Sequence, residues 1–236
     1  MKAIILAAGM GRRLQEASGG LPKSMIMIQG KSILHRQIES CQQVGIEKFV
    51  FVLGFKRDEM EAHILEVLEP DQIEIVENKD YATTNTLYSL WMASKHFDDD
   101  FIYFNADVLF RSDLLEIIIQ PSSNSQLLLE TKSCGEEEVK MIISDENKVL
   151  EISKILPIHK CAGEFIGIGK FNKSVLADFA KFLKAGVDNG EGNNYFEFAV
   201  NDLCRDHFLE AVPTNGVPCI EIDFPEDLQR ALTLLD

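Results

Sequence analysis

The stretch LAAGMGRRL, residues Leu6–Leu14, is the most informative part of the sequence for both the fold and the binding chemistry of this chain. It continues a nearly unbroken apolar run, Lys2–Ala8, and such a run is typical of a strand buried on both faces of a parallel sheet. The glycines let a ligand approach the backbone closely, and the amide groups of such a loop form a concave anion-binding surface. Arg12 and Arg13 add fixed positive charge, so the stretch predicts a phosphate-binding loop.

Lys23 extends the positive charge of this loop, because it follows further along the chain and Pro22 stiffens the backbone before it. Each of these cations alone would be interpreted more simply as a solvated surface residue. Together, in a glycine-rich loop after a buried strand, they favour a phosphate site. The loop lacks the third glycine of the dinucleotide-binding GxGxxG pattern and the Gly-Lys-Ser/Thr ending of a Walker A loop. A Rossmann oxidoreductase is therefore not favoured.

Beyond the loop, apolar periodicity predicts strands that alternate with helices. Strands are expected at 48–53, 73–76 and 101–105, and helices at 33–44, 57–68 and 86–97. This alternation indicates a parallel sheet with right-handed crossovers. After residue 120 the pattern changes, and short, antiparallel strands are expected at 126–131, 139–143, 149–153 and 163–171. Helices at 173–185 and 195–206, a strand at 220–223 and a helix from Pro225 complete the predicted α/β fold.

The composition narrows the classes of partner. A net charge of −15 repels nucleic acid and anionic lipid. No stretch approaches the roughly 18 apolar residues of a membrane helix, and the first strand is too short for a signal peptide. Five cysteines without a CxxC pair favour free thiols over disulfides or zinc. We therefore expect a cytoplasmic protein with no nucleic-acid or membrane partner, and the sequence assigns no oligomeric state. No metal or triad spacing is seen among His35, His63, His96, His159 and His207.

LAAGMGRRL, followed by LPKSM at Leu21–Met25, resembles the signature of the nucleotidyltransferase family that includes sugar-1-phosphate nucleotidyltransferases and phosphocholine cytidylyltransferases. Two aspartates also match, Asp107 in FNADVLF and Asp223 in IEIDFPEDLQRA. The resemblance covers nearly the whole chain. It implies a Rossmann-like core and a direct attack of an acceptor phosphate on the α-phosphate of an NTP, with release of pyrophosphate and no covalent enzyme intermediate.

The resemblance also implies a role for each matched residue. Arg13 matches the catalytic arginine, and Lys23 matches the lysine that bridges the phosphates of NTP and acceptor. Asp107 and Asp223 match the Mg²⁺ ligands. Mg²⁺ prefers few carboxylates together with water or phosphate oxygens, which suits two aspartates from distant strands. The nucleotide is expected to contact Leu6, Ala7, Ala8, Gly9, Gly11, Arg12, Tyr81, Asn85 and Ala106.

Three segments resemble the phosphocholine cytidylyltransferase branch of the family: Glu77–Leu90, Ala162–Gly167 and Asn194–Glu197. A quaternary ammonium is bound by aromatic faces and carboxylates. Glu221 and Asp223 alternate with isoleucines, so both carboxylates would share one face of their strand. The acceptor is expected to contact Lys154, Glu164, Tyr195, Glu197 and Glu221, with Phe165 or Phe196 as a wall.

We therefore predict one nucleotidyltransferase domain over residues 1–236, with a nucleotide-binding half (1–120) and an acceptor-binding half (121–236). Its fold is expected to be a Rossmann-like mixed, mainly parallel sheet flanked by helices, with a small antiparallel acceptor-binding subdomain. The predicted reaction is Mg²⁺-dependent transfer of CMP from CTP to phosphocholine, giving CDP-choline and pyrophosphate. A sugar-1-phosphate, phosphoethanolamine, aminoethylphosphonate or inositol phosphate stays open as acceptor. The alternative of another class is a catalytically inactive nucleotide-binding regulatory module, against which the intact Arg13, Lys23, Asp107 and Asp223 argue.

Overall fold

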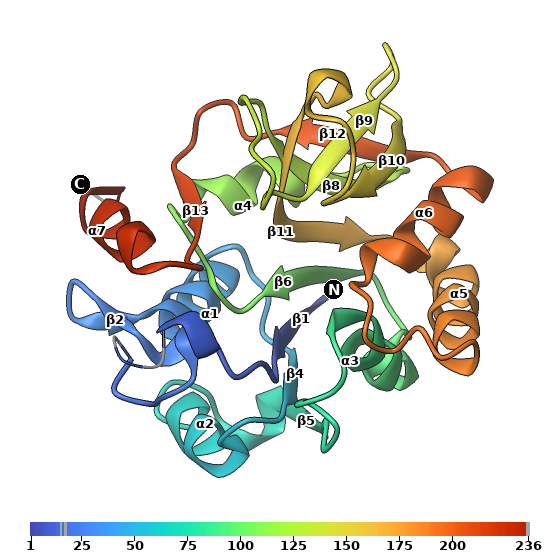
Figure 1. The fold of residues 1–236 in the computed structure, drawn as a ribbon. Helices are drawn as coiled ribbons and strands as arrows, with labels where there is room; N and C mark the ends of the chain where they lie inside the picture. The colour runs from blue at the N-terminus through green and yellow to red at the C-terminus, as the bar shows by residue number, and fades with distance from the viewer. Residues whose placement is uncertain (15, 17, 235–236) are drawn as a thin grey trace.

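The computed structural model describes residues 1–14, 16 and 18–234. Its central sheet has nine strands, in the order β10-β9-β11-β6-β1-β4-β5, with β8 paired to β11 and β12 paired to β8 (Figure 1). The first four strands of this sheet along the chain are β1 (Lys2–Ala7), β4 (Phe49–Leu53), β5 (Ile73–Glu77) and β6 (Phe101–Asn105). They pair in parallel, as the alternation of strands and helices predicted.

The remaining strands of this sheet are β8 (Ser125–Glu130), β9 (Lys140–Ile143), β10 (Val149–Ser153), β11 (Gly163–Phe171) and β12 (Leu209–Pro213). β11 is antiparallel to β6, β8 and β9, so the expected change to antiparallel pairing is confirmed. One end of this long strand pairs with β6 and the other with β9. The sheet is therefore continuous across the two halves of the chain. β12, which pairs in parallel with β8, was not predicted.

Helices cover both faces of the parallel strands (Figure 1). One face carries α1 (Ile33–Gln43), α2 (Arg57–Ile64) and α4 (Asp113–Ile118), and the other α3 (Thr86–Ala93), α5 (Leu176–Asp188) and α6 (Glu197–Asp206). In β1, Ile5 packs with the first set and Ile4 with the second, because successive side chains of a strand point to opposite faces. Burial on both faces explains the unbroken apolar run in the sequence.

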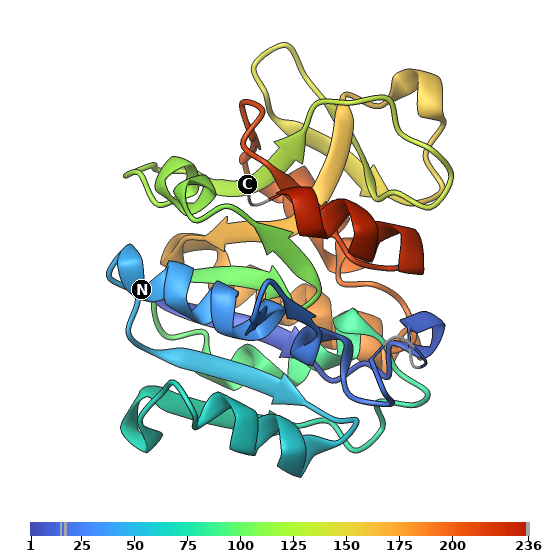
Figure 2. The same ribbon diagram turned by 90° about the vertical axis from the view of Figure 1, so that its left-hand side faces the viewer.

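Smaller elements surround this core. They are β2 (Met27–Ile28) with β3 (Lys31–Ser32), β7 (Val108–Phe110) with β13 (Cys219–Glu221), α7 (Pro225–Leu234), and 3-10 turns at Arg12–Leu14, Lys23–Met25, Pro70–Gln72, Ser94–His96, Ile158–Lys160 and Lys173–Val175. Figure 2 shows α1 in front of the parallel strands, with α7 above it. Among the described residues, no helix combines the length and the apolar character that crossing a bilayer requires.

Several helices are shorter in the structure than predicted. The predictions followed buried apolar residues, and some of these lie beyond the point where the helix ends. The helix expected over 57–68 ends at Ile64, although Leu68 is still buried. The helix expected over 86–97 gives way at Ser94 to a 3-10 turn. The strand expected over 220–223 ends at Glu221, so Asp223 lies just beyond it.

Candidate active site

A cleft of about 600 Å³ lies where the loops after β1, β5 and β6 meet. These loops follow the carboxyl ends of parallel strands, and β1 has β4 on one side and β6 on the other. In open α/β sheets, ligands bind at such a point, where consecutive connections leave in opposite directions. The predicted site residues that line the cleft are Leu6, Ala7, Ala8, Gly9, Gly11, Arg12, Arg13, Lys23, Tyr81, Asn85, Ala106, Asp107, Lys154, Tyr195, Glu197, Glu221 and Asp223.

Two glycines allow the first loop to pack closely. Gly11 has a left-handed φ of 55°, and a Cβ at this residue would lie 3.0 Å from Cβ of Lys23. Gly54 follows β4, and a Cβ there would lie 2.7 Å from Cβ of Tyr81 and 2.9 Å from the carbonyl oxygen of Ala8. Sequence reasoning did not identify Gly54, although its place after a buried strand was a signal. Only residues without side chains let these segments approach so closely.

Lys23 lies between two aspartates that are far apart in the sequence. Its Nζ is 2.6 Å from Oδ2 of Asp107 and 2.6 Å from Oδ1 of Asp223. Asp107 lies in the turn between β6 and β7, and Asp223 follows β13; because β7 pairs with β13, the two carboxylates come together. Burial lowers the pKa of Lys23, but the two carboxylates outweigh this effect and raise the pKa above its ordinary value. The ammonium thus stays charged at physiological pH.

This pair of carboxylates fits a magnesium ion. Mg²⁺ binds oxygen ligands and is usually held by one or two carboxylates together with substrate phosphates and water. Among the described residues, Oδ1 of Asp107 is buried and meets no hydrogen-bond donor. A buried carboxylate oxygen is costly to leave without a partner. The donor set and this oxygen are therefore suited to a divalent cation.

The two arginines lie at the exposed rim of the cleft. The guanidinium group of Arg13 is 3.5 Å from a carboxylate oxygen of Glu137 and 4.7 Å from the centre of the Phe224 ring. Exposed ion pairs contribute little free energy, so Arg13 can exchange Glu137 for an anionic ligand at low cost. Sequence reasoning missed Glu137, because an acidic residue in a run of three glutamates resembles a solvated turn.

At one end of the cleft, where the acceptor was predicted, a buried carboxylate lies beside an exposed aromatic ring. Tyr195 is 45% exposed, and Nζ of Lys154 lies 5.2 Å from its ring centre. Glu197 is buried, and its Oε2 meets no hydrogen-bond donor among the described residues. Burial raises the pKa of Glu197 to about 7, although its own backbone N–H and Lys154 act in the lowering direction. Glu221 accepts a hydrogen bond from Nδ2 of Asn105 at 3.2 Å.

Burial also affects Glu221, whose pKa is raised well above its ordinary value by burial and by the neighbouring Asp107 and Asp223. The two acids that face the acceptor end therefore sit in surroundings that disfavour unpaired negative charge. A cation placed between them would stabilise their ionised forms. This end of the cleft is thus electrostatically suited to a positively charged group.

Glu164 is the one predicted site residue that the geometry does not bring to the cleft. It is buried on β11, and its carboxylate lies 2.5 Å from Nζ of Lys132, which also contacts Glu130 at 2.9 Å. Glu164, on β11, thus pairs with Lys132 and does not line the cleft, so the structure gives no support for its predicted contact with the acceptor. Neither Phe165 nor Phe196 forms an exposed wall, because both are buried and their ring centres are 5.8 Å apart in the core.

A polar network lies at the end of the cleft where the nucleotide was predicted. Asn78 is buried just after β5, and its Nδ2 donates to hydroxyl oxygens of Thr84 and Ser89, each at 3.1 Å. Asn85 caps α3, since its Oδ1 accepts from the backbone N–H of Thr86 at 2.9 Å. This cap occupies one polar atom of a side chain that we predicted at the base or ribose. Sequence reasoning missed Asn78, whose position at a strand end was the available signal.

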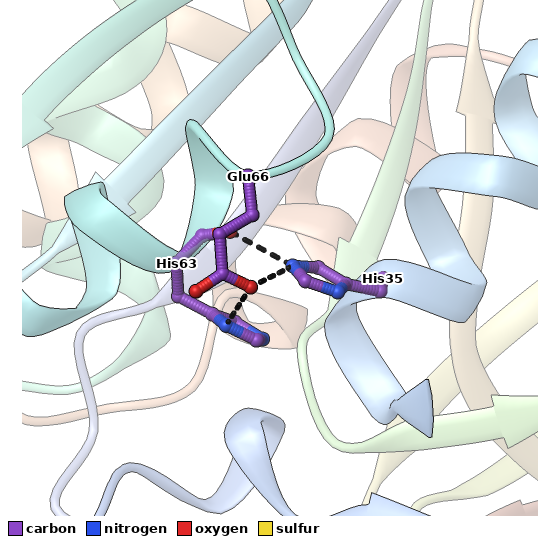
Figure 3. A group of neighbouring side chains, drawn as sticks. All are labelled: His35, His63 and Glu66. Carbon is purple, nitrogen blue, oxygen red and sulfur yellow. Dashed lines mark hydrogen bonds and ion pairs between the residues drawn. The ribbon is translucent and has the colours of Figure 1, made fainter. Parts of the chain in front are cut away.

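No metal or triad spacing was seen for His35 and His63, but in the structure they come together with Glu66 between α1 and α2 (Figure 3). Their rings are stacked, with centres 3.7 Å apart and planes 12° apart. Nδ1 of His63 is 3.2 Å from Glu66, and its Nε2 is 2.8 Å from Oγ of Ser32. The nitrogen lone pairs of an imidazole lie in the plane of its ring. Because the two rings are stacked, their lone pairs do not point towards one shared metal ion. As arranged, the cluster is a hydrogen-bonded link between α1 and α2.

Known proteins share sequence with most of this chain. The choline-phosphate cytidylyltransferase of Streptococcus pneumoniae is 24% identical over 244 residues, which cover 100% of this chain and 98% of that protein. The CMP-5′-(3-aminopropyl)phosphonate synthase of Streptomyces rubellomurinus is 33% identical over 98% of this chain, but the match covers 38% of that protein. The bifunctional protein GlmU of Methanococcus aeolicus is 26% identical over 99% of this chain and 54% of its own length. The chain thus spans about half the length of GlmU and less than half the length of the synthase.

Solved structures share the fold. The CTP:phosphocholine cytidylyltransferase of S. pneumoniae superposes with a TM-score of 0.81 at 23% identity, covering 100% of this chain and 99% of that one. The inositol-1-phosphate CTP transferase of T. maritima gives a TM-score of 0.78 at 19% identity, covering 100% of this chain and 97% of that one. The model of the MobA-like NTP transferase domain matches residues 3–133, which is more than half of the chain. Sequence and fold together establish that the chain belongs to the family of MobA-like NTP transferase domains.

Proposed function

We propose that the protein transfers CMP from CTP to phosphocholine in a Mg²⁺-dependent reaction that releases pyrophosphate. The observation that carries this proposal is the pairing of two features in one cleft. The Lys23–Asp107–Asp223 cluster lies in the same cleft as the buried Glu197 carboxylate, whose Oε2 lacks a partner among the described residues, and the exposed ring of Tyr195. The first feature suits phosphates and a metal ion, and the second suits a cationic head group.

At the nucleotide end, the backbone amides of residues 8–11 and the guanidinium groups of Arg12 and Arg13 bind the triphosphate. Arg13 stabilises the charge that develops as pyrophosphate leaves. Lys23 contacts the phosphates of both substrates and holds them for in-line attack. Asp107 and Asp223 would hold Mg²⁺, which supplies neutralisation of phosphate charge. The protein's own groups thus position and polarise, and no side chain acts as a nucleophile.

At the acceptor end, the trimethylammonium group lies against the face of Tyr195 and near the carboxylates of Glu197 and Glu221. This group has no N–H to donate, so it does not require a directed acceptor. It needs diffuse negative charge, which the ionised form of Glu197 provides, and Oε2 of this carboxylate meets no hydrogen-bond donor among the described residues. Lys154 leaves the ring of Tyr195 and contacts the acceptor phosphate.

The relatives support this choice of donor and acceptor. The relative named choline-phosphate cytidylyltransferase aligns with the whole chain and nearly all of its own length. The second candidate is a primary ammonium acceptor, such as phosphoethanolamine or aminoethylphosphonate. It is favoured by the 33% identity to a synthase named for an aminopropylphosphonate product. A primary ammonium would also suit Glu197, but it lacks the methyl groups that contact Tyr195.

The test is pyrophosphate release with phosphocholine, Mg²⁺ and each common NTP in turn. We expect turnover with CTP that exceeds turnover with the other nucleotides, and its loss in Asp107→Asn, which keeps the shape of the side chain and removes its charge. Asp145→Asn, in an exposed turn, is the matched control and should behave as the unmodified protein. Absence of pyrophosphate with every NTP would refute the proposal.

A further inference from the structure

We propose that Gln37 is a positioning residue that fixes the turn carrying Asp107; the inference rests on the proposed function, in which Asp107 holds the metal. Gln37 lies in α1 and is 0% exposed. Its Nε2 donates to the carbonyl oxygen of Asn105 at 2.9 Å and to that of Val108 at 2.8 Å. These two carbonyl groups bracket Ala106 and Asp107. One amide group therefore closes both ends of the turn.

The two acceptors determine how the Gln37 amide is oriented. A primary amide has two N–H donors, and here each carbonyl takes one. A flipped amide would place Oε1 against two carbonyl oxygens. Among the described residues, Oε1 meets no hydrogen-bond donor. A buried acceptor without a partner is unfavourable. The favourable contribution of this amide therefore comes from the hydrogen bonds that its nitrogen donates to the turn.

The other contacts of the turn show what Gln37 adds. The N–H of Ala106 donates to the carbonyl of Leu6 at 3.3 Å, and the N–H of Ile222 donates to the carbonyl of Asp107 at 3.0 Å. Asp223 directly follows Ile222. The turn is thus held by β1, by the chain after β13 and by α1, and these contacts set how the Asp107 carboxylate faces that of Asp223. The contacts from β1 and from Ile222 join backbone groups, whereas Gln37 holds the turn with its side chain.

Gln37 can hold the turn only if α1 itself is fixed, and α1 is anchored near its N-terminus. Oγ of Ser32 caps α1 by accepting from the N–H of His35 at 3.1 Å, and it also contacts Nε2 of His63 in α2 at 2.8 Å. The stacked rings of His35 and His63 strengthen the same link (Figure 3). α2 therefore holds α1, and α1 presents Gln37 to the turn. The histidine cluster does not line the cleft, and its contribution to the site is to hold α1 in place.

The test compares Gln37→Met with Gln126→Met, a matched control. Gln126 is also buried, its Nε2 donates to Glu210 at 2.9 Å, and its Oε1 also lacks a partner among the described residues, but it does not line the cleft. The direct readout is Mn²⁺ binding, followed by electron paramagnetic resonance in the presence of α,β-methylene-CTP. Losing a group that orients a metal ligand costs about 10- to 100-fold in metal affinity. We expect at least a 10-fold weaker affinity in Gln37→Met and an unchanged affinity in Gln126→Met.

Two further variants make the outcome decisive. Asp107→Asn reports on the metal assignment itself, and Gln37→Asn keeps an amide that is too short to reach both carbonyls. Gln37→Asn should weaken Mn²⁺ binding in the same direction, and it carries the comparison if Gln37→Met does not fold. Higher Mg²⁺ should restore part of kcat in either Gln37 variant, which a general loss of folded protein would not allow.

Equal Mn²⁺ affinity in the Gln37 and Gln126 variants, with binding lost in Asp107→Asn, would overturn the role of Gln37 and leave the proposed function standing. Undiminished binding in Asp107→Asn would instead refute the metal assignment on which both proposals rest. The first result and the second are therefore distinguishable in one titration series.

Discussion

Replacing Glu197 by Gln should remove a stability penalty that grows with pH. Burial raises the pKa of Glu197 from an ordinary 4.5 to about 7, in spite of the opposing effects of its backbone N–H and of Lys154. Between these two values the unfolded chain loses a proton that the folded chain keeps. The contribution of Glu197 to stability therefore falls as pH rises from 4.5 to about 7, and it falls no further above the folded pKa.

The size of the effect follows from the two pKa values. Each pKa unit corresponds to about 1.4 kcal/mol, so the penalty reaches roughly 3 kcal/mol above neutral pH. This is a large part of the roughly 5–15 kcal/mol by which folded domains are usually stable. The substituted amide does not titrate, so the free energy of unfolding of Glu197→Gln relative to the unmodified protein should rise by that amount across the pH range.

The assay is urea unfolding of both proteins from about pH 4.5 to about pH 8, with Glu146→Gln as an exposed control. The difference between Glu197→Gln and the unmodified protein should grow with pH, while the control difference stays flat. Parallel pH profiles for all three proteins would show that Glu197 has the same pKa in the folded and unfolded states, which would refute the reasoning. Phosphocholine should also lower the pKa of Glu197, so its binding should release protons near pH 6.5, measurable by calorimetry in two buffers.

Three further predictions concern turnover. Arg13→Ala and Lys23→Ala should each lower kcat about 10²- to 10³-fold with an unchanged far-UV spectrum, and near-normal pyrophosphate release by either would remove that residue from the mechanism. Tyr195→Leu should raise KM for phosphocholine about 2- to 30-fold and leave KM for CTP unchanged; equal KM values in initial-rate assays would contradict the aromatic contact. Glu164→Gln should change KM for the acceptor by less than about 2-fold, since an ion pair outside the cleft holds this residue; a larger change would return Glu164 to the acceptor site.

The sequence predicted much of the cleft, because its residues follow the ends of buried strands. In a parallel sheet, the carboxyl ends of neighbouring strands meet at one edge, so the loop at 8–13, the turn at Asp107 and the segment after β5 converge there. Asp223 was assigned as a Mg²⁺ ligand together with Asp107 through a matched motif, on opposite sides of the nucleotide. The structure supplies the local reason why the two lie together, which is the antiparallel pairing of β7 with β13.

Long-range contacts account for what the sequence did not predict. Gln37 resembles any polar helix residue until its acceptors, 68 and 71 positions away, are known. His35 and His63 show no metal spacing in the sequence, yet packing of α1 on α2 stacks their rings. The ion pair of Glu164 with Lys132 was not predicted, because strand alternation does not reveal which carboxylate a lysine neutralises. In each case the missing information is the partner, which only tertiary packing provides.

A competition between acceptors distinguishes phosphocholine from the other candidate substrates. The protein, CTP and Mg²⁺ are incubated with equal concentrations of phosphocholine, phosphoethanolamine, aminoethylphosphonate and glucose-1-phosphate, and the initial ratio of products gives the ratio of kcat/KM values. We expect CDP-choline to dominate, because Tyr195 and Glu197 favour a methylated cation. A clear excess of CDP-glucose would contradict the cationic acceptor site, and an excess of either primary-amine product would contradict the assignment of phosphocholine.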